Sequence, residues 1–341
     1  MAGKVLVTGG TGYIGGEVID QLLAKGYSVN TTVRNTSKSE PRLRERWPDA
    51  GERLQVFQAD LMDDAGWAEA NAGCYAVAHI ASPFPLAVPK NENLLIVPAR
   101  DGALRAVRFA EEAGVERVVL TSSAAAIAYG HPISKTQFTK DDWTQVENPS
   151  VAAYAKSKTI AERSARDWVA ENAPDMIFCS INPVAVFGPI ANDDLSTFIE
   201  MVQKMLDGSI PLAPNMGIGV IDVRDVAAAH VAAIEAPSEV VKDGRFPMQQ
   251  RFLWLKEMAD SLRERAPELA RKAPKRSMPD FMVKMLAPFV AEMNTLKSEL
   301  GKTRDVDGTH TAHVLSLDYI TAEQCLEDTA RSLAEHGLIK G

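Results

Sequence analysis

The sequence predicts an α/β fold with a doubly wound parallel sheet and a smaller, mostly helical C-terminal region. Over about the first 180 residues, short β-branched runs alternate with longer helical patterns, which is typical of a parallel sheet covered by helices on both faces. After Phe187 prolines become frequent, and from Gln250 onward the pattern is mostly helical. The candidate strands are Lys4–Thr8, Ser28–Val33, Leu54–Gln58, Tyr75–Ile80, Arg117–Leu120 and Met176–Ile181.

Amphipathic stretches such as Ile14–Ala24 and Leu94–Ala113 separate these strands and are expected to be helices. Pro98 lies inside the second stretch and predicts a kink or a late helix start. Further on, Gly219–Val223 leads into Asp225–Glu235, which resembles a return to the first domain. We therefore expect one domain over residues 1–187, re-entered by 218–248, and a smaller cap made of 188–217 and 249–341.

The composition is that of an ordinary folded protein, with 341 residues, 46% hydrophobic and 24% charged. The net charge of −8 argues against a nucleic-acid partner, because a basic face is the usual footprint of nucleic-acid binding. No apolar run reaches the roughly 18 residues of a membrane span, and we expect neither a membrane segment nor a signal peptide. The three cysteines are scattered along the sequence, which predicts a cytoplasmic location without disulfides. His310 and His313 have no evident cysteine or carboxylate partner to complete a ligand set, so we expect no metal site.

A glycine-rich loop follows the first strand directly and opens the first helix, in the segment VLVTGGTGYIGG. Its glycines Gly9, Gly12 and Gly15 permit a tight turn, a close approach of the backbone to a pyrophosphate, and close packing of helix on strand. The helix N-terminus adds unpaired N–H groups and a partial positive charge. The loop therefore predicts a dinucleotide site, which also includes Thr8, Tyr13 and Ile14.

The end of the second strand indicates which dinucleotide binds. An NAD site usually places a carboxylate about 20 residues past the glycines, but no acidic residue occurs between Asp20 and Glu40. Instead, Arg34 and Lys38 supply a guanidinium and an ammonium, which suit the 2′-phosphate of NADP. The alternative is that both cations are ordinary surface charges.

A serine, a tyrosine and a lysine form the candidate catalytic group. Ser122 and Ser123 follow the fifth strand, at the carboxyl edge of the sheet where ligands of open α/β sheets sit. Tyr154 and Lys158 are four residues apart and would share one helix face. A neighbouring ammonium is expected to lower the pKa of the phenol, which eases proton transfer, and a serine hydroxyl would hold a substrate carbonyl.

These motifs resemble those of the extended short-chain dehydrogenase/reductases, and among them the dihydroflavonol reductase-like group of NADPH-dependent carbonyl reductases. The resemblance covers nearly the whole chain. The segments that carry it are VTGGTGYIGG, TTVRN, Asp60-Leu61, HIASP at 79–83, VVLTSSAA at 118–125, YAKSK, NPVAVFGP at 182–189 and DVRDVAAAH at 222–230.

The resemblance implies a Rossmann-type fold and catalysis by Ser123, Tyr154 and Lys158, with Tyr154 as the proton donor. It implies further cofactor contacts from Asp60 and Leu61 at the adenine, Ala81 and Ser82 in the groove, Ser122, and Pro183 and Val186 on the nicotinamide side. We expect the substrate to meet Pro83, Phe84, Ser123, Tyr129 and Tyr154 beneath the cap.

Two departures from the family pattern matter for the chemistry. Many relatives carry an asparagine in the central helix that orders a water near the lysine, and Arg105 stands at the matching position here. The residues around Tyr154 also lack the Asn-Trp-Tyr-Cys context of cinnamoyl-CoA reductases, which disfavours a CoA thioester as substrate.

The sequence therefore predicts reversible NADPH-dependent reduction of an uncharged aldehyde or ketone by a monomer or homodimer. A nucleotide-sugar epimerase or dehydratase on the same scaffold is the first alternative, although the carboxylate typical of its NAD site is missing. A hydroxysteroid dehydrogenase is a second alternative. The alternative of another class is a non-catalytic regulator that senses a dinucleotide, but such proteins typically lose the tyrosine or the lysine.

Overall fold

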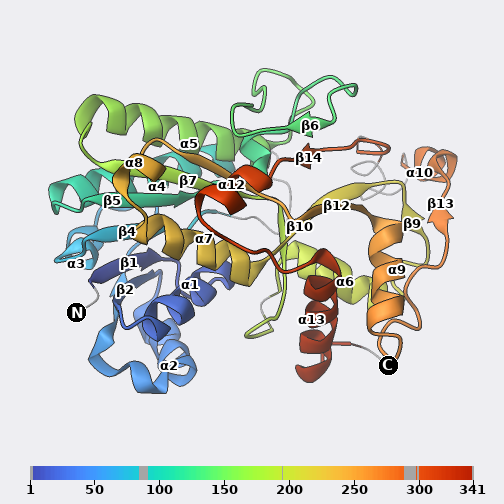
Figure 1. Cartoon of the computed structure of the whole chain (residues 1–341), viewed down its shortest axis with the longest axis horizontal. Helices are drawn as coiled ribbons and strands as arrows, with labels where there is room; N and C mark the ends of the chain where they lie inside the picture. The colour runs from blue at the N-terminus through green and yellow to red at the C-terminus, as the bar shows by residue number, and fades with distance from the viewer. Residues whose placement is uncertain (1–2, 84–90, 194, 288–296, 298, 340–341) are drawn as a thin grey trace.

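A seven-stranded, all-parallel sheet forms the centre of the protein (Figure 1). The structure is a computed structural model that describes residues 3–83, 91–193, 195–287, 297 and 299–339. The strand order is β11-β7-β5-β4-β1-β2-β3. The strands are β1 (Lys4–Thr8), β2 (Ser28–Val33), β3 (Leu54–Gln58), β4 (Ala76–His79), β5 (Arg117–Thr121), β7 (Ile177–Pro183) and β11 (Arg245–Met248). The predicted fold class is confirmed, and all six predicted strands are present.

Helices cover both faces of this sheet, because its central strands are apolar on both sides. Val5 and Val7 of β1 pack in the same core as α1 and α7, whereas Leu6 packs on the opposite face with α4 and α5. The helices of this region are α1 (Tyr13–Ala24), α2 (Thr36–Arg46), α3 (Trp67–Asn71), α4 (Asn93–Glu112), α5 (Ala153–Asn172), α7 (Val223–Glu235) and α8 (Ser238–Val241), with 3-10 turns at Pro48–Arg53 and Ala124–Ala126.

Pro98 does not delay the start of α4. The helix begins at Asn93 and runs to Glu112 with Pro98 in its second turn. A proline at this position removes one backbone hydrogen bond of the helix. The neighbouring side chains of Leu95, Ile96 and Ala99 are buried, and this packing holds the first turns in place.

A second layer of structure lies beside the main sheet (Figure 1). Its core is formed by a three-stranded sheet and the three helices α6, α9 and α13. These elements are β8 (Ala185–Phe187), β10 (Gly217–Asp222), β12 (Arg251–Trp254), α6 (Thr197–Leu206), α9 (Leu255–Arg265) and α13 (Ala322–Glu335). Short pieces complete the region: β9 (Ala213–Pro214), β13 (Ser277–Met278) and α10 (Asp280–Leu286).

Two features of the structure show how the later part of the chain rejoins the main sheet. First, β10 pairs with β8 and β12 instead of rejoining the main sheet, so the return to that sheet begins with α7 and is completed by β11. Second, α12 (Thr309–Val314) packs on β11, where Thr311 Oγ1 donates to Pro247 O at 2.6 Å. Residues 309–314 therefore cover the edge strand β11 of the main sheet, which is one way to protect an edge from pairing.

The chain after α10 also contacts the segment that follows β5. Its strand β14 (Asp305–Val306) pairs in parallel with β6 (Gln137–Phe138), which follows β5 along the chain. Among the helices that the structure describes, none is long and apolar enough to cross a membrane.

Candidate active site

The glycine loop forms a tight turn at the carboxyl end of β1. Gly9 has a φ of +73°, and Gly12 N donates to Gly9 O at 2.9 Å. A Cβ at Gly15 would lie 2.4 Å from Gly9 O, so only glycine allows α1 to pack so close to the turn. Thr8 Oγ1 accepts hydrogen bonds from the backbone of Ile80 and Ala81, which ties the loop to the end of β4.

This turn fits a dinucleotide pyrophosphate. The N-cap of α1 is Gly12, which makes no side-chain cap hydrogen bond, and the first turn of the helix contains no acidic residue. The first N–H groups of α1 therefore have no side-chain cap. A small concavity beside this helix start is lined by Thr11, Gly12, Tyr13, Asn192 and Ser196, among others.

Two exposed cations, Arg34 and Lys38, lie where β2 meets α2. Asn35 caps α2, since its Oδ1 accepts from Lys38 N at 3.0 Å; Lys38 lies in the first turn of the helix and Arg34 directly precedes the cap. The first acidic residue of α2, Glu40, pairs with Arg44. The end of β2 is thus rich in positive charge.

The predicted adenine edge is held together by an arginine. Asp60 Oδ1 accepts from Met62 N at 2.8 Å, which forms a turn after β3. Arg105 on α4 donates to Leu61 O and Asp64 Oδ1, each at 2.6 Å. Arg105 therefore fixes the loop after β3.

Ser123, Tyr154 and Lys158 come together at the carboxyl ends of β5 and β7. Ser123 hydrogen-bonds the Tyr154 phenol, and its Oγ also lies 3.4 Å from Pro183 O on β7. Lys158 is buried on α5, and its Nζ donates to Thr121 O at 3.3 Å. Lys156, two residues from Tyr154, points elsewhere and pairs with Glu92 at 2.8 Å.

The pKa of Tyr154 differs from the sequence expectation. Burial raises the pKa of Tyr154 to about 12, and the hydrogen bond from Ser123 lowers it only in part. Burial also lowers the pKa of Lys158 to about 8, while the nearby Glu162 carboxylate opposes that shift. The pKa of Tyr154 is therefore raised where the sequence predicted a lowering: desolvation has the largest effect, and the group that lowers this pKa is Ser123, not Lys158.

The structure adds a buried carboxylate that the sequence analysis did not single out. Glu162 is one turn beyond Lys158 on α5 and has no exposed surface. Ser122 Oγ donates to Glu162 Oε2 at 2.5 Å, so the Ser122 hydroxyl is engaged there. The spacing of Tyr154, Lys158 and Glu162, four residues at each step, was the available signal.

The substrate side is bordered by Tyr129, which packs with Tyr154 against Ala125, Val151 and Ala155. The Arg304 guanidinium lies 4.1 Å from the centre of the Tyr129 ring. A pocket next to Tyr129 is also lined by His131, Phe138, Glu299, Lys302 and Arg304. Two other residues were predicted to meet the substrate. Pro83 lies in the loop after β4, and Phe84 lies outside the described residues.

Comparison with known proteins places this arrangement in a family. The sequence profile of the NAD dependent epimerase/dehydratase family matches residues 5–247. The chain belongs to this family. It is 34% identical to cinnamoyl-CoA reductase CAD2 of Medicago truncatula, over 97% of this chain and 95% of that protein. It is 30% identical to dihydroflavonol 4-reductase of Zea mays, over 78% of this chain and 75% of that protein.

A solved structure extends the comparison to three dimensions. Yeast methylglyoxal/isovaleraldehyde reductase Gre2, complexed with NADPH, superposes with a TM-score of 0.80 at 26% identity, covering 98% of this chain and all of that one. The protein is thus an NAD(P)-dependent oxidoreductase of the reductase group, within the extended short-chain dehydrogenase/reductases. This conclusion removes the reading as a non-catalytic regulator.

Proposed function

We propose that the protein uses NADPH to reduce an uncharged aldehyde or ketone to the alcohol. The observation that carries the proposal is the group of Ser123, Tyr154 and Lys158, joined at one sheet edge to a glycine loop with cations at the end of β2. The relatives named above that are reductases, including one solved with NADPH, support it.

When bound, NADPH would be the source of the hydride that the carbonyl carbon receives. Tyr154 donates its phenolic proton to the carbonyl oxygen, so that one hydride and one proton together give the alcohol. Ser123 holds that oxygen and stabilises the charge that develops on it. Lys158, one helical turn from Tyr154 on α5, would supply a positive charge on the same helix face and bond the ribose hydroxyls of the cofactor.

Preference for NADPH is proposed from Arg34 and Lys38, and the remaining predicted contacts of Thr8, Tyr13, Ile14, Asp60, Leu61, Ala81, Ser82, Ser122, Pro183 and Val186 are part of the same proposal. A free carbonyl is preferred to a CoA thioester because the sequence around Tyr154 lacks the motif of cinnamoyl-CoA reductases. We also propose that the protein acts in the cytoplasm as a monomer or homodimer, in keeping with its three buried, unpaired cysteines.

The test is NADPH oxidation with a panel of aromatic aldehydes, keto esters, diketones, a dihydroflavonol, a steroid ketone and a cinnamoyl-CoA thioester. We expect turnover of an uncharged carbonyl, and a fall in kcat of about 10²- to 10⁴-fold in Tyr154→Phe, the usual size of a general-acid contribution. Lys156→Ala is the matched control, since Lys156 bonds Glu92 and leaves the group intact. Turnover of the thioester alone, or full activity in Tyr154→Phe, would contradict the proposal.

A further inference from the structure

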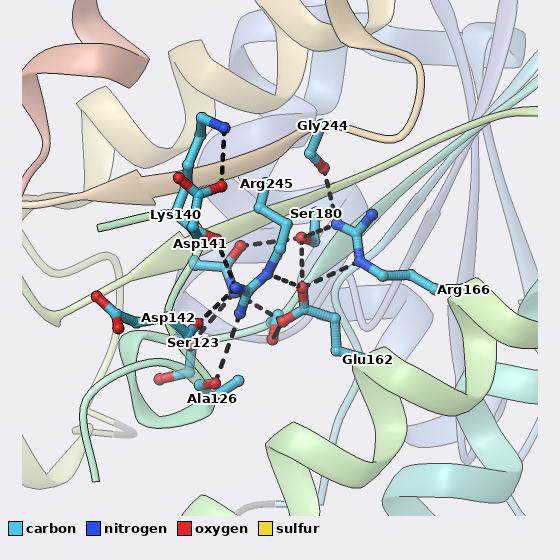
Figure 2. A network of polar contacts seen from close by, with 12 residues as sticks. Ser123, Ala126, Lys140, Asp141, Asp142, Glu162, Arg166, Ser180, Gly244 and Arg245 are labelled. Atoms are coloured by element: carbon cyan, nitrogen blue, oxygen red, sulfur yellow. Dashed lines mark hydrogen bonds and ion pairs between the residues drawn. The ribbon is translucent and has the colours of Figure 1, made fainter. Parts of the chain in front are cut away.

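Beneath the candidate active site lies a carboxylate with both oxygens filled by hydrogen bonds (Figure 2). Glu162 Oε2 accepts from Ser122 Oγ at 2.5 Å and from Asn182 Nδ2 at 2.8 Å. The same Asn182 amide lies 3.3 Å from Ser123 O. Glu162 is therefore attached to the Ser122–Ser123 segment at two points, one direct and one through Asn182.

The second oxygen of Glu162 faces two guanidinium groups. Glu162 Oε1 accepts from Arg245 Nε at 2.7 Å, Arg166 Nε at 3.2 Å and Ser180 Oγ at 2.9 Å (Figure 2). Although burial raises the pKa of the Glu162 carboxyl, the two guanidiniums lower it to about 2. Glu162 is thus a buried anion at every pH at which the protein would be used.

Arg245 is held in turn by groups outside the site. Its Nη1 donates to Lys140 O and Asp142 O, each at 2.6 Å, and its guanidinium lies 3.6 Å from the centre of the Trp143 ring. The carboxylate is therefore fixed from the segment before α5 as well as from β7 and β11. A rigid buried ion cluster of this kind costs desolvation energy and gives little net stability, which invites a role beyond stability.

We propose that Glu162 is a positioning residue for the reduction, which holds the Ser122–Ser123 segment in place and keeps the Lys158 ammonium charged. The inference rests on the proposed function. Glu162 is one helical turn from Lys158, so its negative charge favours the charged form of the lysine in a site where burial disfavours it. Without it, Lys158 would lose its proton in the working pH range and no longer help Tyr154.

The groups around Lys158 leave Glu162 as its favourable charge. On β4, His79 is buried with a pKa of about 3, so it is neutral and gives no support. On the far side of Glu162, Arg166 and Arg245 are positive and repel an ammonium once the carboxylate is removed. Tyr154 and Tyr129, which face the active-site side, are neutral because burial raises both pKa values.

The test compares Glu162→Gln, which removes the charge, with Glu162→Asp, which keeps it on a shorter side chain. In Glu162→Gln we expect the basic limb of the kcat profile, which lies near the Lys158 pKa of about 8, to move about one pH unit lower. The dissociation constant of NADPH, measured by nicotinamide fluorescence, should rise over the same pH range. Glu162→Asp should lose activity through poorer hydrogen bonding but keep the basic limb in place.

Because Glu162→Gln leaves the guanidiniums of Arg166 and Arg245 without their anionic partner, it could fail to fold. The double variant Glu162→Gln/Arg166→Gln removes one charge of each sign and leaves the net charge of the cluster unchanged, and thermal unfolding checks that it is folded. The proposal would be overturned if the folded variants lost activity equally at every pH. In that case the basic limb of the kcat profile and the NADPH affinity would both stay as in the wild type. If the wild-type protein reduced no carbonyl, the reductase proposal would fail, while the pH dependence of NADPH binding would still test Glu162.

Discussion

At the scale of single residues, Arg34 decides the predicted choice between the two dinucleotides. The exposed guanidinium follows β2 directly and has the position to bond a 2′-phosphate that NADH lacks. A hydrogen bond to a charged group contributes about 1.5–3 kcal/mol, so Arg34→Ala should weaken NADPH binding about 10- to 100-fold. NADH binding should change little. The measurement is the ratio of the two dissociation constants, obtained by fluorescence titration.

The matched control for this prediction is Arg42→Ala. Arg42 is also exposed, but it lies within α2, about two helical turns beyond the N-cap Asn35, and so further from the end of β2. It removes an equal charge from the same region, so it reports the effect of long-range electrostatics alone. An equal loss of NADPH affinity in both variants would show that Arg34 makes no specific contact.

The spacing of residues in the sequence predicted the candidate catalytic pair but not the buried carboxylate next to it. Tyr154 and Lys158 could be paired from the sequence because a helix brings residues four apart onto one face. Glu162 continues the same spacing, but a glutamate on a helix is almost always solvent-exposed unless paired. Its partner Arg245 is on a strand far along the chain, and no local pattern joins the two. Buried ion pairs between distant elements are therefore what the sequence left hidden.

At the scale of elements, the packing of α1 on the glycine loop gives a sharp test. A Cβ at Gly15 would meet Gly9 O at 2.4 Å, and this backbone atom cannot move without opening the turn. At Gly16 a Cβ would meet only the end of the flexible Arg46 side chain. We expect Gly15→Ala to lower the free energy of unfolding by about 1–3 kcal/mol and to weaken NADPH binding. Chemical denaturation and fluorescence titration measure the two effects.

Gly16→Ala is the neighbouring control on the same helix. Since alanine is the better helix former by about 0.5–1 kcal/mol, this variant should be as stable as the wild type or slightly more so. NADPH affinity should remain. If both alanine variants behaved alike, the close contact between α1 and the turn would not be what requires glycine at position 15.

The elements also show what periodicity predicts well and what it misses. The first six strands were found because buried parallel strands read as β-branched runs between helical patterns. The seventh, β11, has the sequence RFPM and gives no such signal. Its Arg245 is present for the ion pair with Glu162, and its Pro247 is tolerated because β11 is an edge strand. The pairing of β10 in a separate sheet could not be predicted either, since the sequence of a strand does not show which strand it pairs with.

At the scale of the whole molecule, the C-terminal segment packs on α7 and buries an acidic side chain. Asp225 is buried, and its Oδ2 accepts from Ile320 N at 3.0 Å. Burial and the nearby Asp222 raise the pKa of Asp225 to about 7. A carboxyl whose pKa is higher in the folded than in the unfolded protein binds its proton more tightly when folded. The folded state therefore loses stability as the pH rises from about 4, the unfolded value, to about 7.

Asp225→Asn should remove this pH dependence while the amide oxygen still accepts from Ile320 N. Above pH 7 the variant is expected to melt at least about 3 °C higher than the wild type, since 1 kcal/mol moves Tm by about 2–4 °C in domains of 150–250 residues. At pH 4 and below the two proteins should melt close together, because Asp225 is then protonated in the folded state and at least about half protonated in the unfolded state. Asp318→Asn, an exposed carboxyl on the same segment, should show a smaller effect. Melting curves of Asp225→Asn that stay parallel to those of the wild type from pH 4 to pH 8 would mean that Asp225 ionises without cost, and that the C-terminal segment leaves it open to water.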